Sequence, residues 1–342
     1  MTELKRVEGE SIPDPRWPTS FLLAIVVLTM CFADYWAYSI AYHQAPTIYL
    51  DIVQGTASAP AQYRVGVILL AHFLAQHGHL GLRHTLTLID TSAAFITVFT
   101  LFYLLRRSKI YCQADPVRRW FAAAGLVVLT QFYFAWMVWY QRPETLTNAA
   151  TVALMLLLLT VRPPLPKTSA WVITGLCMLG LAVIQGFVRA DVAFAFHIGI
   201  LLVCLTRAGE GLSLPRAVQA VVSVMAILLA GGIQYYLMKI KYPHATYGTT
   251  APIQLIDNLT HLNIAFLLFI GPYAWTVAIL LTKQREQFRG PIAALVCGSI
   301  VFFGMWLTFG RAEEVRIFMP FALSLAPLTI ETAMRRFLPH NQ

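Results

Sequence analysis

Long runs of apolar residues separated by short polar segments repeat along almost the whole chain. A helix that crosses about 30 Å of hydrocarbon needs about 20 residues, because it rises 1.5 Å per residue. The chain is predicted to be all-α, a polytopic bundle of about ten spanning helices within a single membrane domain over residues 1–342, with 1–18 as a polar tail. The ten runs cover 19–38, 85–105, 119–139, 145–161, 169–188, 190–206, 217–238, 263–282, 290–309 and 317–333.

An eleventh apolar stretch, at 63–79, is predicted to lie along the membrane rather than to cross it. Counting it as a crossing would place the basic segment 106–119 outside, against the excess of Lys and Arg that inner loops carry. The stretch begins with Tyr63 and Arg64 and ends in a His-rich segment, which favours an amphipathic juxtamembrane helix within the first outer loop, 39–84.

With ten crossings, both termini are expected on the inner, cytoplasmic side, in the inner (plasma) membrane of the cell. Inner segments then hold about two thirds of the 25 lysines and arginines, as the positive-inside rule requires. The outer segments are 39–84, two tight turns near 142 and 189, the loop 239–263, and 310–316.

Composition excludes a soluble globular protein. Of the 342 residues 58% are hydrophobic and 12% are charged, and the mean hydropathy is +0.65. The net charge of +9 invites a nucleic-acid partner, but the basic residues form short clusters between apolar runs, so we expect none. The five cysteines form no CxxC pair, and we predict no thiolate metal site.

Three outer turns share one pattern, in which arginine and acidic residues lie together at helix ends. Ionisable groups at membrane depth are costly and are candidates for function. The groups are Arg142 with Glu144, Arg189 with Asp191, and Arg311 and Arg316 with Glu313 and Glu314.

Two interpretations of these turns stay open. Each group is a local ion pair that holds helix ends together, or the three turns meet around one outer cavity. Guanidinium groups suit bidentate recognition of phosphate, and carboxylates orient hydroxyl groups, so such a cavity would suit an anionic lipid headgroup.

Asp34 lies at the outer end of the first apolar run, where no other charge is near in the sequence. It is a helix-end or surface carboxylate, or it is a general base that deprotonates an acceptor hydroxyl. The second role requires hydrogen-bond reach to the nucleophile.

The order of these features resembles the GT-C superfamily of membrane glycosyltransferases, which includes protein O-mannosyltransferases and aminoarabinose transferases. An acid follows the first helix, a long outer loop holds an amphipathic helix, and the turn "GHLGLRH" leads into a second spanning helix that ends in "YLLRRSK". The last element, "EVRIFMPFALSLAPL", is similar to the family's Arg, aromatic and Pro pattern through Arg316, Phe318 and Pro320. Where many members have His-Pro-Pro-Leu, this chain has Tyr63-Arg64-Val65-Gly66.

The resemblance implies a polyprenyl-phosphate-linked sugar as donor and transfer to an acceptor hydroxyl at the outer face. Asp34 would be the base, and Arg64, Arg142, Arg189, Arg311 and Arg316 would bind the donor, Arg189 and Arg316 foremost. The acids Glu144, Asp191, Glu313 and Glu314 would position sugar hydroxyls or hold the arginines. The resemblance does not decide whether a divalent metal is a cofactor or whether other membrane proteins are partners.

Two other classes of function compete with a transferase. A transporter or flippase would use the outer arginines to recognise an anionic lipid-linked substrate, with a path through the membrane midplane. A non-catalytic membrane subunit would use them as ion pairs around no cavity.

Overall fold

The computed structural model describes all residues except 1–14, 45–46, 137–141, 247–252, 313 and 338–342. The prediction of an all-α protein is confirmed, since the described residues form helices and include no strand. The α-helices are α1 (Arg16–Gln44), α2 (Ile48–Gln54), α3 (Gly66–Gly78), α4 (Leu82–Arg107), α5 (Lys109–Gln113), α6 (Pro116–Ala135), α7 (Glu144–Thr160), α8 (Lys167–Val188), α9 (Ala190–Cys204), α10 (Arg216–Tyr235), α11 (Leu255–Thr260), α12 (Ile264–Thr282), α13 (Gly290–Phe309), α14 (Met319–Ser324) and α15 (Ala326–Phe337). Single turns are η1 (Ala61–Tyr63), η2 (Arg207–Gly209), η4 (Arg285–Gln287) and η5 (Val315–Phe318), and η3 (Tyr236–Lys241) is a π-helical end of α10.

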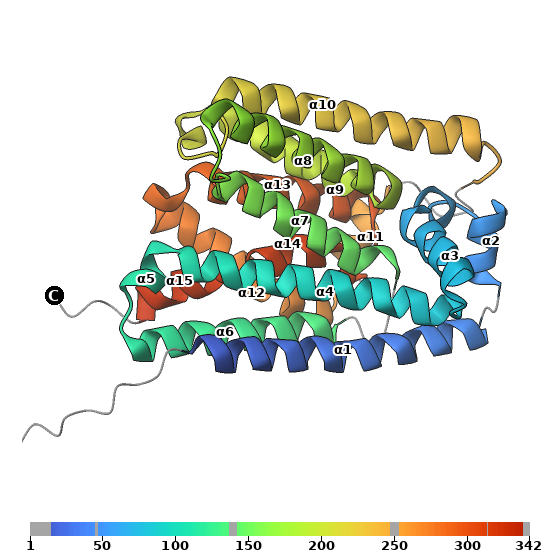
Figure 1. The fold of residues 1–342 in the computed structure, drawn as a ribbon, viewed down its shortest axis with the longest axis horizontal. Helices are drawn as coiled ribbons and strands as arrows, with labels where there is room; N and C mark the ends of the chain where they lie inside the picture. Colours follow the sequence, from blue (N-terminus) through green and yellow to red (C-terminus); the bar gives the residue numbers. More distant parts are fainter. Residues whose placement is uncertain (1–14, 45–46, 137–141, 247–252, 313, 338–342) are drawn as a thin grey trace, which may run out of the picture.

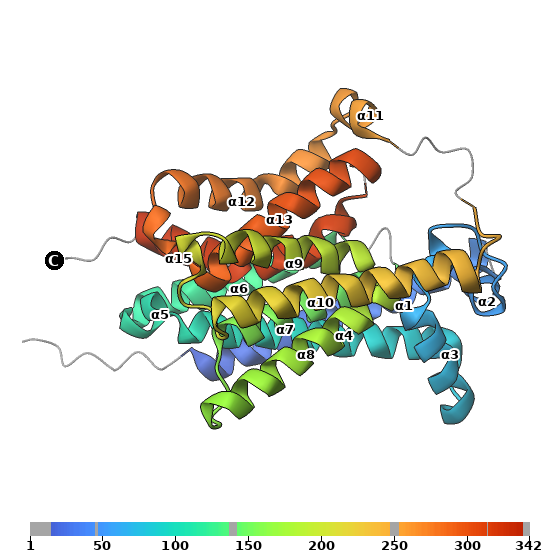
Figure 2. The same cartoon turned by 90° about the horizontal axis from the view of Figure 1, so that it is seen from above.

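The long helices run along one common direction, which gives the bundle two distinct ends. Figure 1 shows α2 and α3 at one end, on the right, and α5 with the end of α15 at the other. We call these the α3 end and the α5 end. In Figure 2, α11, α12 and α13 lie on one side of the bundle, and α3 projects from the other side.

Several helices are long and apolar enough to cross a membrane, which indicates an integral membrane protein. Among the described residues six helices pass by length and composition, and η5 with α14 and α15 forms a seventh candidate that is bent by 58°. The six are α1, α4, α8, α10, α12 and α13.

This is fewer than the ten runs expected from the sequence, and the difference has two causes. α7 and α9 have 17 and 15 residues, or about 25 and 23 Å at 1.5 Å per residue, against about 30 Å of hydrocarbon. α6 has 20 residues but carries Arg118 and Arg119 in its first turn, which lowers its hydropathy.

The helix α3 lies outside the main bundle and is too short to span. Its 13 residues measure about 20 Å. Leu70, Phe73 and Leu74 on it are 48%, 54% and 39% exposed. Such an exposed apolar face on a short projecting helix is typical of an element that lies in the membrane interface.

The centre of the bundle depends on the close crossing of α9 and α13 at two glycines. A Cβ on Gly199 would lie 2.6 Å from the Cα of Gly298 and 2.7 Å from the carbonyl oxygen of Ala294. The two backbones therefore touch, as small residues allow between membrane helices. This antiparallel contact brings the start of α9 and the end of α13 to the same end of the bundle.

Candidate functional site

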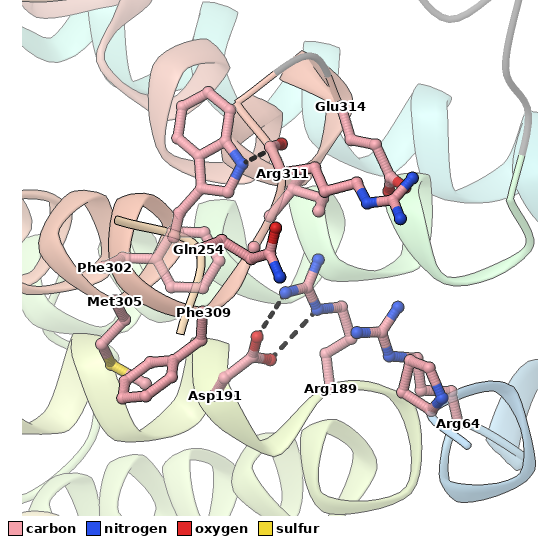
Figure 3. Close-up of a pocket in the computed structure, with 13 residues that line it drawn as sticks. Arg64, Arg189, Asp191, Gln254, Phe302, Met305, Phe309, Arg311 and Glu314 are labelled. Carbon is pink, nitrogen blue, oxygen red and sulfur yellow. Dashed lines mark hydrogen bonds and ion pairs between the residues drawn. The ribbon is translucent and has the colours of Figure 1, made fainter. Parts of the chain in front are cut away.

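A cavity of about 620 Å³ opens at the α3 end, where segments far apart in the sequence meet (Figure 3). One part of its wall is polar and largely cationic, and the other part is aromatic and aliphatic. The polar lining consists of Arg64, Arg189, Asp191, Gln254, Arg311 and Glu314. The apolar lining consists of Pro60, Phe302, Met305, Trp306, Phe309 and Ile317, and Gly310 completes the wall.

Arg189 is the deepest guanidinium in the wall, in a one-residue break between α8 and α9. Its φ of −159° and ψ of 89° are not helical, so α8 ends before this residue and α9 begins after it. The side chain is 7% exposed, forms two hydrogen bonds with the Asp191 carboxylate, one of them 3.0 Å from Nε to Oδ1, and lies 5.5 Å from the ring of Phe302. Burial by itself lowers the pKa of Arg189, but Asp191, Glu144 and Glu314 outweigh it, and the net pKa lies above the ordinary value. The guanidinium therefore stays charged.

Arg64 reaches the same wall from the first loop. Gly66, at the start of α3, permits the approach, because a Cβ there would lie only 3.0 Å from Cβ of Phe187 at the end of α8. Arg64 forms a 3.0 Å ion pair with Glu144, the first residue of α7. Burial by itself raises the pKa of Glu144, but Arg64, Arg316 and Arg189 hold it below its ordinary value.

Arg316 and Arg142 lie behind the wall rather than in it. Arg316 is 4% exposed, and its Nη2 donates to Glu314 at 2.7 Å. Arg142, just before α7, is close enough to Arg316 for the two charges to interact. Glu144, which pairs with Arg64 of the wall, also attracts Arg316. The charges behind the wall therefore help to hold the charges of the wall in place.

Arg311 is the exposed guanidinium of the cavity, and its backbone is fixed from two sides. The indole of Trp306 donates to the Arg311 carbonyl oxygen at 3.0 Å. On the other side, the amide of Asn258 in α11 donates to the carbonyl oxygens of Leu307 and Gly310, both at 2.7 Å. Ala312 N donates to Oδ1 of Asn258 at 2.8 Å.

The sequence does not predict the role of Asn258, which begins a glycosylation sequon, Asn258-Leu259-Thr260, within the loop expected at 239–263. The side chain is 5% exposed and makes three hydrogen bonds, so it is a bracket between α11 and the 310–312 turn and is inaccessible for glycosylation in the folded protein.

We expect Asn258→Ala to lower the free energy of unfolding by about 2 kcal/mol, because buried backbone groups lose their partners. Thr260→Ala is the matched control, since it also removes the sequon but leaves the three bonds intact. Thermal unfolding of both variants in one detergent measures the difference. Equal melting temperatures would show that Asn258 does not act as a bracket.

The structure brings most of the predicted site residues together. Arg64, Arg189, Asp191, Arg311 and Glu314 line the cavity, and Arg142, Glu144 and Arg316 lie directly behind it. We call these eight residues the arginine cluster. If all are ionised, five arginines and three carboxylates leave a net charge of +2. The remaining acid of this region, Glu313, lies outside the described residues.

Asp34 lies elsewhere. It is 3% exposed on α1, which packs against α4, and it is not among the residues that line the cavity. One turn further along α1, the hydroxyl of Tyr38 donates to Asp90 of α4 at 2.6 Å. In this arrangement Asp34 belongs to the α1–α4 interface.

Among the described residues, no three His, Cys, Asp or Glu side chains come together as a metal site would require. Comparison with protein-family models, with curated proteins and with solved structures gave no match. The interpretation of the cavity therefore depends on its own chemistry and on the order of features in the sequence.

Proposed function

We propose that this protein is a membrane glycosyltransferase that binds a polyprenyl-phosphate-linked sugar in the cavity at the α3 end, on the outer face of the membrane. The observation that carries the proposal is the composition of the wall, in which Arg64, Arg189 and Arg311 face one space with Phe302 and Trp306.

The polar wall supports binding of a phosphate diester. Arginine offers planar, paired donors that match phosphate oxygens, and a charge-assisted hydrogen bond is stronger than a neutral one. The net positive charge of the arginine cluster favours an anion over a cation or a neutral sugar. Because Arg189 is already held by Asp191, it is preorganised to stabilise charge on a leaving phosphate.

The apolar wall supports the lipid and sugar parts of the same ligand. Phe309, at the end of α13, lines the cavity and is 63% exposed. Beside it, α11 carries Ile256 and Leu259, which are 79% and 56% exposed, and Gln254 N fixes α11 to α13 by donating to Thr308 O at 2.7 Å. A ligand with an isoprenoid chain would have apolar surface to follow from the cavity into the lipid.

The proposed reaction transfers a sugar from the lipid phosphate to a hydroxyl. A carboxylate accepts the proton of the acceptor hydroxyl, and the hydroxyl oxygen bonds to the anomeric carbon of the sugar. The bond from that carbon to the phosphate oxygen breaks, and its electron pair stays on the lipid phosphate beside the arginines.

A carboxylate that lines the cavity is better placed for the base role than Asp34. A base must lie within about 3 Å of the proton it takes, directly or through one water. Both Asp191 oxygens bind Arg189, whereas Glu314 binds Arg316 through Oε2. We therefore assign the base role to Glu314.

The test measures binding and transfer separately with a labelled polyprenyl-phosphate sugar and purified protein. Arg311→Gln is expected to weaken donor binding about tenfold, because one charge-assisted hydrogen bond is lost. Lys241→Gln, which removes an exposed charge from η3 at the same end, is the control and should bind as the original protein does. Equal binding by both variants would reject the cavity as the donor site.

Transfer rates then distinguish the two candidate bases, Glu314 and Asp34. We expect Glu314→Gln to bind donor but lose transfer, and Asp34→Asn to keep both. Loss of transfer in Asp34→Asn alone would restore Asp34 as the base.

One observation favours a transporter or flippase as the second candidate. The candidate span made of Val315–Ser324 and Ala326–Phe337 is bent by 58°. Interrupted helices are common in transporters. Movement of labelled lipid across vesicles that contain the protein, without any transfer to acceptor, would favour this alternative.

A further inference from the structure

A second cavity, of about 220 Å³, lies at the opposite end of the bundle from the arginine cluster. It is formed where the α7–α8 and α9–α10 connections meet, at the α5 end in Figure 1. Its volume is several times the roughly 30 Å³ that one molecule occupies in liquid water. Among the residues that line it are Arg162, Lys167, Trp171, Thr174 and Ser213.

The two connections that form this cavity are tied together by hydrogen bonds. Ser213 N donates to the carbonyl oxygen of Leu159, the penultimate residue of α7, at 3.0 Å. Nη2 of Arg162 donates to Leu212 O at 3.4 Å. The site is thus built across two loops, with the start of α8 as one of its walls.

The hydroxyl of Ser213 provides the strongest sign of a ligand. The residue is 4% exposed, lines the cavity, and its Oγ makes no hydrogen bond within the described part of the chain. Buried polar groups in folded proteins almost always have a partner, because leaving one unsatisfied costs free energy. A hydroxyl in this position suits a ligand oxygen.

The charge of the lining indicates that the ligand is an anion. Arg162 and Lys167 contribute two positive charges, and no carboxylate is among the lining residues. Lys167 is also the first residue of the 22-residue helix α8, whose preceding residue gives no side-chain cap. The free N–H groups of a first helical turn and the helix dipole favour a negative group at that place.

The surroundings indicate that the anion belongs to a lipid. The Nζ of Lys167 lies 5.2 Å from the centre of the Trp171 ring, and Leu165 on the rim is 45% exposed. On the same helix, Val172 and Leu176 are 54% and 63% exposed, as expected where α8 faces acyl chains. Trp and Lys beside such a surface are typical of the headgroup layer, and basic pockets between membrane helices bind anionic headgroups.

We propose that this second cavity binds the phosphate group of an anionic phospholipid, with Lys167 and Arg162 as its cationic contacts and Ser213 as a hydroxyl contact. The site is separate from the proposed donor cavity and does not depend on the proposed function.

The test titrates purified protein in neutral detergent with dihexanoyl phosphatidylglycerol and measures the dissociation constant by thermophoresis. We expect Lys167→Gln to weaken binding about tenfold and Ser213→Ala to weaken it a few fold. Arg336→Gln, which removes an exposed charge at the same end but outside this cavity, is the control and should have no effect. Equal affinity in all three variants would overturn the proposal.

Two further ligands identify the source of the phosphate and need no variant to fold. Phosphatidylcholine of the same chain length, which has no net charge, is expected to bind at least about tenfold more weakly, because the site contributes two cations. Glycerophosphate at equal concentration should not displace phosphatidylglycerol. Equal binding of the two lipids would overturn the assignment of an anion, and displacement by glycerophosphate would overturn the assignment of a lipid.

Discussion

Gly199→Ala is expected to lower the free energy of unfolding by about 3 kcal/mol or more, because the α9 and α13 backbones touch at this position. The added methyl group would lie 2.6 Å from Cα of Gly298 and 2.7 Å from the Ala294 carbonyl oxygen. Neither atom belongs to a flexible side chain, so the two helices must separate. The melting temperature in detergent measures the loss.

The control for this variant is Gly180→Ala in α8, where a Cβ would meet nothing within 4 Å. Alanine favours the helix over glycine by about 0.5–1 kcal/mol, so Gly180→Ala should be neutral or stabilising. If the two variants melt alike, the close crossing of α9 and α13 is wrong. The crossing also brings Asp191 of α9 and Phe302 of α13 into the wall of the same cavity, so Gly199→Ala should weaken donor binding even in protein that stays folded.

Glu144→Gln is expected to lower the free energy of unfolding by about 3 kcal/mol, because breaking a buried ion pair leaves uncompensated charge. Glu144 is 6% exposed, binds Arg64 at 3.0 Å, and attracts the buried Arg316 as well. Glutamine keeps the shape but removes the charge from between two guanidinium groups. Thermal unfolding at neutral pH measures the effect.

The same variant has a defined pH dependence. The pKa of Glu144 lies below its ordinary value in the folded protein, so its ionised form contributes stability above the ordinary glutamate pKa of about 4.3. That contribution is lost as the pH falls through the lowered pKa. The difference between the original protein and Glu144→Gln should therefore shrink as the solution is acidified below about pH 4.

Glu210→Gln is the matched control for charge removal. Glu210 also pairs with an arginine, Arg216 at 3.3 Å, but the two side chains are 58% and 42% exposed. Exposed pairs contribute about 0–1 kcal/mol, so this variant should melt within a few degrees of the original protein. A loss as large as that of Glu144→Gln would contradict the argument from burial.

The arrangement of charges bears on the three classes of function. A scaffold subunit predicts paired charges without a cavity, and among the described residues of the arginine cluster three ion pairs form: Arg64 with Glu144, Arg189 with Asp191, and Arg316 with Glu314. The arginine cluster that contains these pairs lines and backs a cavity of about 620 Å³ and has five arginines to three acids, which supports the proposed binding role over a purely structural one.

By itself, the sequence determined that the protein is all-α and membrane-embedded, and it located most of the long helices, but it overestimated how many of them are long and apolar enough to span a membrane. Long runs of apolar residues are unfavourable in water and enter the lipid. Inside lipid the backbone must form its own hydrogen bonds, so such runs become helices. The same runs indicated which turns hold Arg189, Arg311 and Glu144, since charged residues are rare in the apolar centre of a membrane bundle. The stretch 63–79 could likewise be recognised as a short helix of its own, because its apolar run is bounded by Arg64 and a His-rich end.

Only the tertiary structure decided which of these residues meet. Arg64 and Glu144 are 80 positions apart in the chain, and their contact depends on how α3, α7 and α8 pack. The crossing at Gly199 and Gly298, the bracket made by Asn258, and the place of Asp34 in the α1–α4 interface are likewise outcomes of packing. Hydropathy along a chain defines helices and their ends, but it does not specify helix neighbours or rotation. Those depend on the fit of side chains across helix surfaces, and that fit decides which side chains share a cavity.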